Sequence, residues 1–239
     1  MSKSFAFSIA LLLIIASNSL YSQKFGIEAG YVQHERYGDQ FKTTYFNGAK
    51  LGLNVEFGLK NNFSLLSGAL YSVVYSSNTQ NYTVSDSVNY KTFNHTIEVP
   101  LHLQYTLPVS KNLKFFAFAG PKLNFGLAQP QKVTVVLSGK HDLPTIQDNM
   151  KPFMRTESVG YSENDLYTGY RYTNNNGDEV YVKSIISRIN LQMSIGGGVQ
   201  FKNYQLKSGY DFGINSINKV DSNVILRQRG WYVSLVYKF

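Results

Sequence analysis

The sequence predicts an all-β protein: an eight-stranded antiparallel transmembrane β-barrel of the outer-membrane type, with a long outer loop that contains a β-hairpin. Three observations support this prediction. Apolar and polar residues alternate along eight segments, the connections between the segments are alternately short and long, and charged strand residues take the face opposite the apolar one. Membrane barrels need all three, because one face of each strand meets lipid and the other meets the lumen.

The N-terminus has the pattern of a secretory signal peptide. Lys3 supplies a positive charge, residues 5–16 are apolar, and a polar stretch leads to Gln23. Because this apolar run is shorter than a spanning helix needs, we expect cleavage after Ser22 and not a membrane anchor. The domain prediction is a signal peptide over residues 1–22 and an outer-membrane β-barrel domain over residues 23–239.

The composition limits both the chemistry of the chain and its way of crossing a membrane. Tyr and Phe are abundant, with 18 and 16 copies, and aromatic residues suit the pleated surface of strands. The chain has no cysteine, which excludes disulfides, a lipid anchor on an N-terminal cysteine and cysteine-ligated metals. No apolar run after Gln23 is long enough for a spanning helix, so a membrane-spanning form must cross with strands.

Each of the eight alternating segments is about ten residues or longer, which is the length a tilted strand needs to cross a bilayer. Ile97 and Val99, for example, alternate with Glu98 and His102. The segments are residues 24–34, 49–59, 63–75, 94–107, 113–127, 188–201, 204–217 and 230–239. The segment at 63–75 is apolar on both faces, so its register stays open. The last segment places Phe239 on its apolar face and closes the predicted barrel.

The connections favour a barrel over a soluble β-sandwich. The short ones, residues 60–62, 109–112 and 202–203, each contain a Lys-Asn pair. The long ones lie between them and cover residues 35–48, 76–93, 129–187 and 218–229. Outer-membrane barrels have tight periplasmic turns and extended outer loops, whereas a sandwich has no reason to sort its loops in this way.

Charged residues within the segments are expected to point into the barrel. A charge on the lipid face costs about 2–4 kcal/mol near the bilayer midplane. The predicted lumen network consists of Glu28, Glu56, Glu98, Lys114, Lys122, Lys207 and Asp211. Since an eight-stranded barrel fills its interior with its own side chains, we interpret the network as a structural polar plug. A narrow, gated ion path is the alternative interpretation.

Several short motifs resemble a known family in their order and spacing. Residues 97–101 read Ile-Glu-Val-Pro-Leu and resemble a strand motif of the Bacteroidetes outer-membrane β-barrel family that includes the PorT-like proteins. The other similar motifs are Leu70-Tyr71-Ser72, Ala119-Gly120-Pro121, Gly196-Gly197-Gly198-Val199, Tyr210 with Gly213, and Tyr237-Lys238-Phe239. The resemblance covers residues 24–239 and implies a barrel related in shape to the small OmpX- and OmpA-like barrels. The secretion role of PorT does not follow from such general barrel motifs.

The connection at residues 129–187 is the most distinctive part of the chain. Residues 133–137 indicate an outward extension of the fifth strand. Residues 167–172 and 180–183 indicate a β-hairpin, with Asn176-Gly177 suited to its tight turn. Tyrosine-rich loops make good contact surfaces, and a lid packed over the barrel mouth is the alternative. The candidate surface-contact residues are Tyr161, Tyr167, Tyr170, Arg171 and Tyr172.

The sequence carries neither a Gly-x-Ser-x-Gly nor a His-Glu-x-x-His motif. His34 and His95 fall at outer strand ends, near Asp39, Ser85 and Ser87 in the loops. We predict a non-enzymatic outer-membrane protein, without cofactor or metal, that binds or supports the envelope through its extracellular loops. The alternatives are a lipid-acting enzyme with a Ser/His/acid site at the rim, and a component of secretion machinery.

The net charge of +8 does not indicate a nucleic-acid partner, because the basic residues are scattered and no binding motif occurs. Attraction to anionic lipopolysaccharide is the expected consequence of that charge. We therefore expect outer-membrane lipid and lipopolysaccharide as surroundings and an envelope or extracellular protein as the candidate partner. The barrel is expected to be a monomer.

Overall fold

The computed structural model describes residues 23–38, 41–81, 87–136, 159–168, 170–173, 179–182, 184, 186–219 and 224–239. The predicted signal peptide, residues 1–22, lies outside the described residues. Among the described residues no helix is long and apolar enough to span a membrane.

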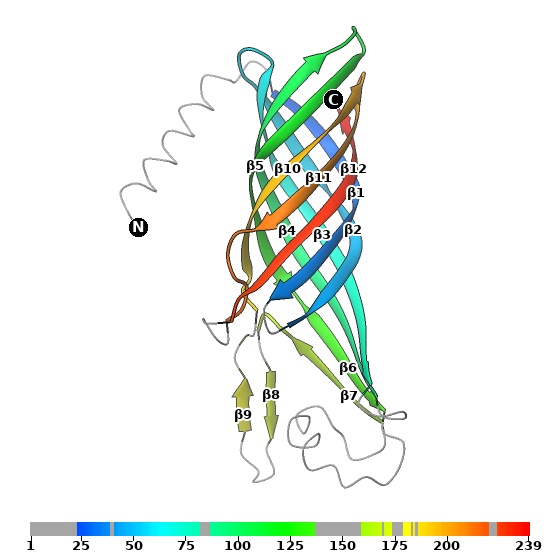
Figure 1. Cartoon of the computed structure of the whole chain (residues 1–239), viewed down its shortest axis with the longest axis vertical. Helices are drawn as coiled ribbons and strands as arrows, with labels where there is room; N and C mark the ends of the chain where they lie inside the picture. The colour runs from blue at the N-terminus through cyan, green and yellow to red at the C-terminus, as the bar shows by residue number, and fades with distance from the viewer. Residues whose placement is uncertain are drawn as a thin grey trace, which may run out of the picture.

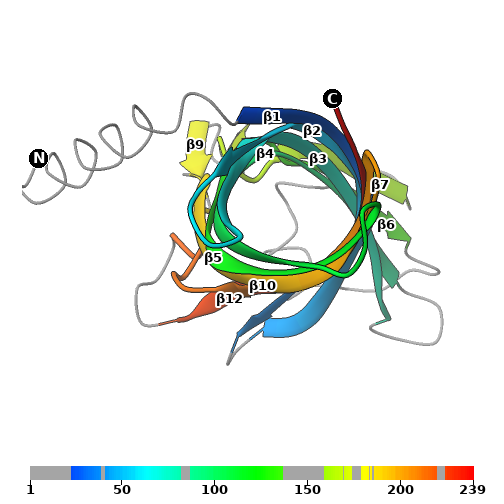
Figure 2. The same ribbon diagram turned by 90° about the horizontal axis from the view of Figure 1, so that it is seen from above.

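Eight long strands form a closed antiparallel barrel, seen from the side in Figure 1 and as a ring in Figure 2. They are β1 (Gln23–Gly38), β2 (Phe41–Gly58), β3 (Phe63–Asn81), β4 (Ser87–Pro108), β5 (Leu113–Ala128), β10 (Ile189–Phe201), β11 (Tyr204–Gly213) and β12 (Leu226–Lys238). Each strand pairs with the next along the barrel, and β1 pairs with β12 from Gly26↔Lys238 to Gly38↔Leu226. Because the ring is closed, no strand edge is left unpaired in the lipid. The fold prediction is confirmed.

The two ends of the barrel differ. One end holds the tight turns at residues 59–62, 109–112 and 202–203, together with the chain end at Phe239 (top of Figure 1). In the first turn Asn61 and Asn62 have φ values of 58° and 65°, which Asn tolerates better than most residues. Since barrels of the outer-membrane type have their tight turns on the periplasmic side, we call this the periplasmic end and the opposite end the outer end.

The strands at the outer end run further than the sequence predicts. The connections expected at residues 35–48 and 76–93 are mostly strand, since β1 and β2 reach Gly38 and Phe41, and β3 and β4 reach Asn81 and Ser87. Outside the bilayer both faces of a strand meet water, so the pairing continues without the apolar–polar alternation that marks a spanning segment. The segment predicted at 204–217 ends instead at Gly213.

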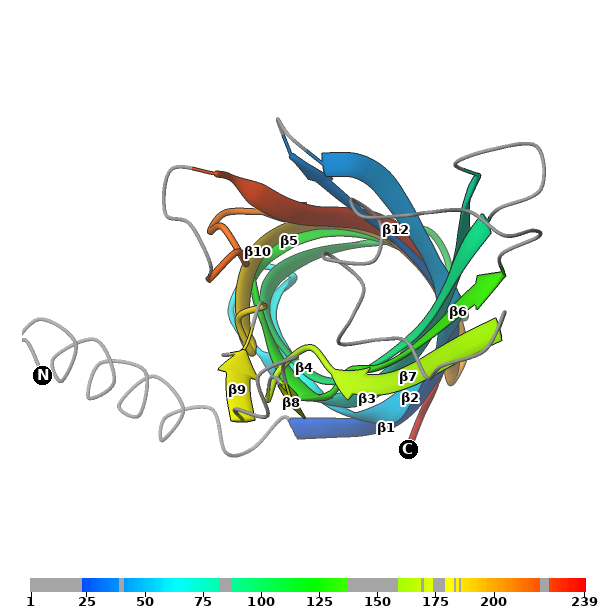
Figure 3. The same ribbon diagram turned by 90° about the horizontal axis from the view of Figure 1, so that it is seen from below.

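At the outer end β4 leaves β5 and takes a new partner. A register shift between His95 and Thr96 marks this point, and beyond it β4 pairs with β6 (Pro130–Val136). β6 pairs in turn with β7 (Val159–Asp165), so a sheet of β3, β4, β6 and β7 projects past the ring (Figures 1 and 3). β6 lies where the sequence predicts a strand extension, whereas β7 was not predicted.

The predicted hairpin is present as a separate two-stranded sheet of β8 (Tyr170–Thr173) and β9 (Glu179–Val182). Its turn, with Asn176-Gly177, lies outside the described residues. Tyr167 and Thr168, expected within the hairpin, belong to the turn that precedes it.

The barrel is apolar outside and polar inside. Large apolar side chains on its outer face, such as Leu53 and Ile195, are 61% and 56% exposed. Among the described residues, buried polar and charged side chains outnumber buried apolar ones. In β3, whose register the sequence left open, Ser64, Ser72 and Val74 point inward and Tyr71 points outward.

Candidate functional site: the lumen network and the outer cavity

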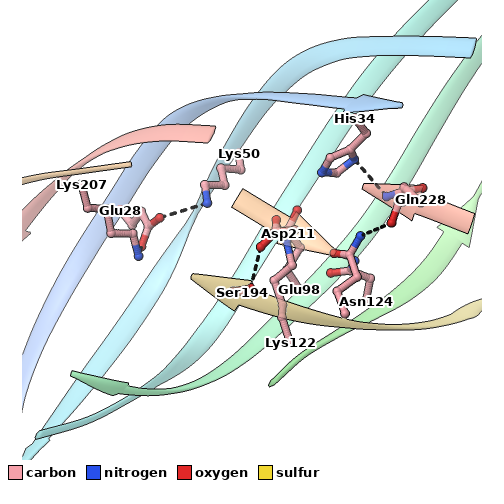
Figure 4. A network of polar contacts seen from close by, with 11 residues as sticks. Glu28, His34, Lys50, Glu98, Lys122, Asn124, Ser194, Lys207, Asp211 and Gln228 are labelled. Carbon is pink, nitrogen blue, oxygen red and sulfur yellow. Dashed lines mark hydrogen bonds and ion pairs between the residues drawn. The ribbon is translucent and has the colours of Figure 1, made fainter. Parts of the chain in front are cut away.

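Two clusters of ion pairs occupy the lumen, as Figure 4 shows. In the first, Glu28 lies between two lysines, with Lys50 Nζ 3.3 Å from Oε1 and Lys207 Nζ 2.5 Å from Oε2. In the second, Lys122 Nζ lies 3.2 Å from Glu98 Oε2 and 2.5 Å from Asp211 Oδ2. Buried charges are tolerated only when they are paired in this way.

The charges of the lumen balance. Near the periplasmic end Lys238 pairs with Glu56, so four acids face four lysines. Lys114, which the sequence assigned to this network, is instead part-exposed beside the periplasmic turn and forms none of the ion pairs between described residues. Its place is taken by Lys50 and Lys238, which the sequence analysis missed. Strand alternation could have identified both, since each shares its inward face with a predicted lumen residue or a buried neighbour.

Aromatic rings fill the space between the ion pairs. Tyr232 is 2% exposed, and Lys50 Nζ lies 3.4 Å from the centre of its ring. The ring has room because Gly209 faces it, where an added Cβ would lie 2.7 Å from Tyr232 Cζ. The other buried apolar side chains of this cluster are Val32, Phe46, Val74, Phe116 and Phe118. Paired charges and rings together occupy this part of the lumen, and small barrels commonly fill their interior with their own side chains.

A chain of amides continues the network toward the outer end. Asn124 Nδ2 donates to Gln192 Oε1 at 2.6 Å, and Gln192 Nε2 donates to the backbone carbonyl oxygen of Gln228 at 3.3 Å. Gln228 Nε2 lies 3.1 Å from His34 Nδ1, so His34 is inside the barrel (Figure 4) and not at a reactive rim.

His95, the other histidine predicted at an outer strand end, has a different partner. His95 Nδ1 lies 2.6 Å from the Tyr71 hydroxyl on the lipid-facing side. Asp39 and Ser85, the other rim candidates, lie outside the described residues, and the side chain of Ser87 is not described.

A cavity of about 480 Å³ opens at the outer end, between the lumen network and the outer loops. Its walls come from β1 to β4, from the junction of β5 and β6, and from the segments around Leu166, Ile186 and Leu226. Arg36 and Gln129 line it and are buried. Neither was a predicted site residue. Arg36 follows the predicted end of its strand at residue 34, and Gln129 begins the predicted connection at 129–187 and belongs to no motif.

Tyr167 lies beside Arg36, is buried, and is not the surface contact that the sequence suggested. It is 6% exposed, and its hydroxyl donates to Asn94 Oδ1 at 2.7 Å. Its ring lies over Gly126, where an added Cβ would come within 2.2 Å of Tyr167 Cζ. The other four candidate contacts, Tyr161, Tyr170, Arg171 and Tyr172, lie on β7 and β8, and their side chains are outside the described part of the chain.

A closed ring with an apolar outer face and a polar interior defines an integral membrane β-barrel. Residues 16–219 match the family model described as "Outer membrane protein beta-barrel domain". The chain belongs to this family, and it is a protein of the bacterial outer membrane.

No curated protein matches the chain. Among solved structures it is similar to Ail of Yersinia pestis, with 12% identity over 91% of this chain and 99% of Ail, and a TM-score of 0.34. Neisserial surface protein A is 12% identical over 91% of this chain and 99% of that chain, with a TM-score of 0.40. The outer membrane protease OmpT of Escherichia coli is 10% identical over 90% of this chain and 97% of that chain, with a TM-score of 0.39.

Proposed function

We propose that this protein is a non-enzymatic outer-membrane barrel that binds at its outer end, with the barrel serving as a rigid anchor. The observation that carries the proposal is the lumen, where balanced ion pairs and the Tyr232 ring occupy the interior. A plugged barrel has little interior left for transport. The projecting sheet of β3, β4, β6 and β7, the separate hairpin and the cavity all lie at the outer end of the barrel.

Three finer proposals accompany this one. The strand motifs, above all Ile97-Glu98-Val99-Pro100-Leu101, support a place among the PorT-like barrels of Bacteroidetes. The apolar run at residues 5–16 supports a signal peptide that ends after Ser22. The positive net charge supports lipopolysaccharide as the surrounding lipid of a monomeric barrel.

Replacing residues 170–182 by a Gly/Ser linker is expected to remove protein contacts of the outer end and to leave the barrel folded. β8 and β9 pair only with each other among the described strands, so their loss breaks no ladder of the ring. The measurement is crosslinking in intact cells followed by mass spectrometry.

The matched control replaces only residues 174–178 by Gly/Ser and so keeps both hairpin strands. Envelope or extracellular proteins should be crosslinked to the unaltered chain and to this control, and lost from the linker variant. The same crosslinked proteins in all three samples would contradict a binding role for the hairpin.

A further inference from the structure

Arg36 is a buried cation without a carboxylate partner among the described residues. It is 6% exposed, and the ion pairs formed by the described side chains do not include it. Its guanidinium has three neutral neighbours: Gln228 Oε1 at 3.4 Å from Nε, Gln129 Oε1 at 3.3 Å from Nη2, and the Tyr167 hydroxyl. A guanidinium has five N–H donors and a charge that is costly to bury unpaired, so its neutral neighbours leave both partly unsatisfied.

Asp165, the last residue of β7, does not neutralise Arg36. Asp165 Oδ1 accepts from the Tyr167 backbone N–H at 2.8 Å, and Oδ2 accepts from the Gln129 backbone N–H at 3.2 Å. These bonds hold the turn that brings Tyr167 and Gln129 beside the arginine. Asp165 therefore positions the neighbours of the cation and takes no part in the ion pairs of the described residues.

Gln129, which accepts from Arg36, carries a second unsatisfied donor next to it. Its side chain is 0% exposed, and its Nε2 has no hydrogen-bond partner. The orientation of the amide follows from chemistry, because a guanidinium can only donate and the amide atom facing it must be the oxygen. The Nε2–H donors of Gln129 are therefore turned away from Arg36, and the guanidinium receives from Gln129 one neutral acceptor and no negative charge.

The rest of the cavity suits an apolar body. Phe46 lies under the guanidinium, with Arg36 Cζ 4.7 Å from the ring centre, and holds it in place by a cation–π contact. Leu166, Ile186 and Leu226 line the same cavity. Its volume of about 480 Å³ lies in the range of small-molecule sites.

We propose that the outer cavity binds a small organic anion, whose carboxylate or phosphate pairs with Arg36 and whose apolar body lies against Phe46 and Leu226. The anion supplies the charge that Arg36 lacks. This inference rests on the proposed function only for the outward position of the cavity, and the described residues that line the cavity all lie outside the hairpin segment 170–182.

The test is calorimetric titration of the purified full chain in lipid nanodiscs. The probes are 1-naphthyl phosphate, 1-naphthoate, inorganic phosphate and the uncharged 1-naphthylmethanol, each corrected with empty nanodiscs. We expect one site for the two aromatic anions and much weaker binding of the other two probes. Equal binding of inorganic phosphate would show a bare anion site, and equal binding of 1-naphthylmethanol a purely apolar one; either result overturns the proposal.

Two variants test whether Arg36 is the side chain that binds the anion. Arg36→Gln is expected to weaken 1-naphthyl phosphate by about 30-fold or more, as loss of one partner of a buried charge pair does. The matched control is Lys91→Gln, which removes a positive charge from an exposed side chain on the same end of the barrel. Unchanged affinity in the Arg36 variant, or an equal loss in the Lys91 variant, would refute the assignment.

Gln129→Glu keeps the proposal testable if Arg36→Gln fails to fold. This variant places a carboxylate where the Gln129 oxygen meets Arg36. We expect it to abolish binding of 1-naphthyl phosphate and to raise the urea concentration at the unfolding midpoint, since Arg36 then has an internal partner. Retained binding in a folded Gln129→Glu protein would overturn the site. Because these titrations contain no cellular partner, their failure is separate from failure of the hairpin experiment.

Discussion

Replacing Lys122 by methionine is expected to lower the free energy of unfolding of the barrel by about 3–5 kcal/mol. Lys122 is 3% exposed and lies between Glu98 and Asp211, which are themselves buried. Without the lysine two carboxylates face each other inside the barrel with no cation between them. Removing one partner of a buried ion pair costs far more than removing an exposed charge, because the remaining charge stays desolvated. The measurement is urea-induced unfolding of the refolded protein in lipid bilayers, followed by the fluorescence of the single tryptophan, Trp231.

Lys114→Met is the control for this experiment. Lys114 lies on the same strand as Lys122 but is part-exposed and takes no part in the ion pairs among the described residues. Its replacement should change the free energy of unfolding by about 1 kcal/mol or less. Equal losses for the two lysines would mean that the ion pairs do not hold the barrel together.

Replacing Tyr232 by alanine is the second change with a large expected effect. The ring packs in the centre of the lumen against Lys50 and over Gly209, so its removal leaves a cavity that the surrounding strands cannot fill. A buried aromatic side chain cut back to alanine costs about 3–5 kcal/mol of unfolding free energy. The same urea titration measures the loss.

Tyr232→Phe serves as the matched variant, because it keeps the ring and removes only the hydroxyl. It should retain most of the stability that Tyr232→Ala loses. If the two variants lost the same amount of unfolding free energy, the hydroxyl and not the packed ring would stabilise the barrel.

In planar bilayers the unaltered barrel is expected to conduct no ions, because its own side chains fill the lumen. Regular single-channel current steps would instead support the alternative of a gated ion path.

Strand alternation predicted most of the barrel because a period of two residues sorts side chains directly into lipid-facing and lumen-facing sets. Glu28, Glu98, Lys122, Lys207 and Asp211 were assigned to the lumen in this way, and the structure brings them together in two clusters. Which acid meets which lysine depends on the register between strands far apart in the chain. A sequence alone does not contain that register.

The outer end was predicted less well for a physical reason. Past the bilayer a strand no longer needs one apolar and one polar face. The residue pattern therefore did not indicate that β1 continues to Gly38, and Arg36 was not predicted as a site residue. Tyr167 was expected on the surface because it belongs to a Tyr-rich loop. Its burial depends on the bare backbone of Gly126, about forty residues earlier in the chain, which leaves room for the ring.

The orientation of the barrel is tested most directly by single-cysteine labelling, because the chain contains no cysteine of its own. Lys91 is exposed on β4 at the outer end, and Lys111 is exposed in a tight turn at the other end. With a membrane-impermeant maleimide, Lys91→Cys should be labelled in intact cells, and Lys111→Cys only after the outer membrane is permeabilised. Labelling of Lys111→Cys in intact cells, with Lys91→Cys protected, would place the cavity and the projecting sheet in the periplasm and contradict a protein that binds at its outer end.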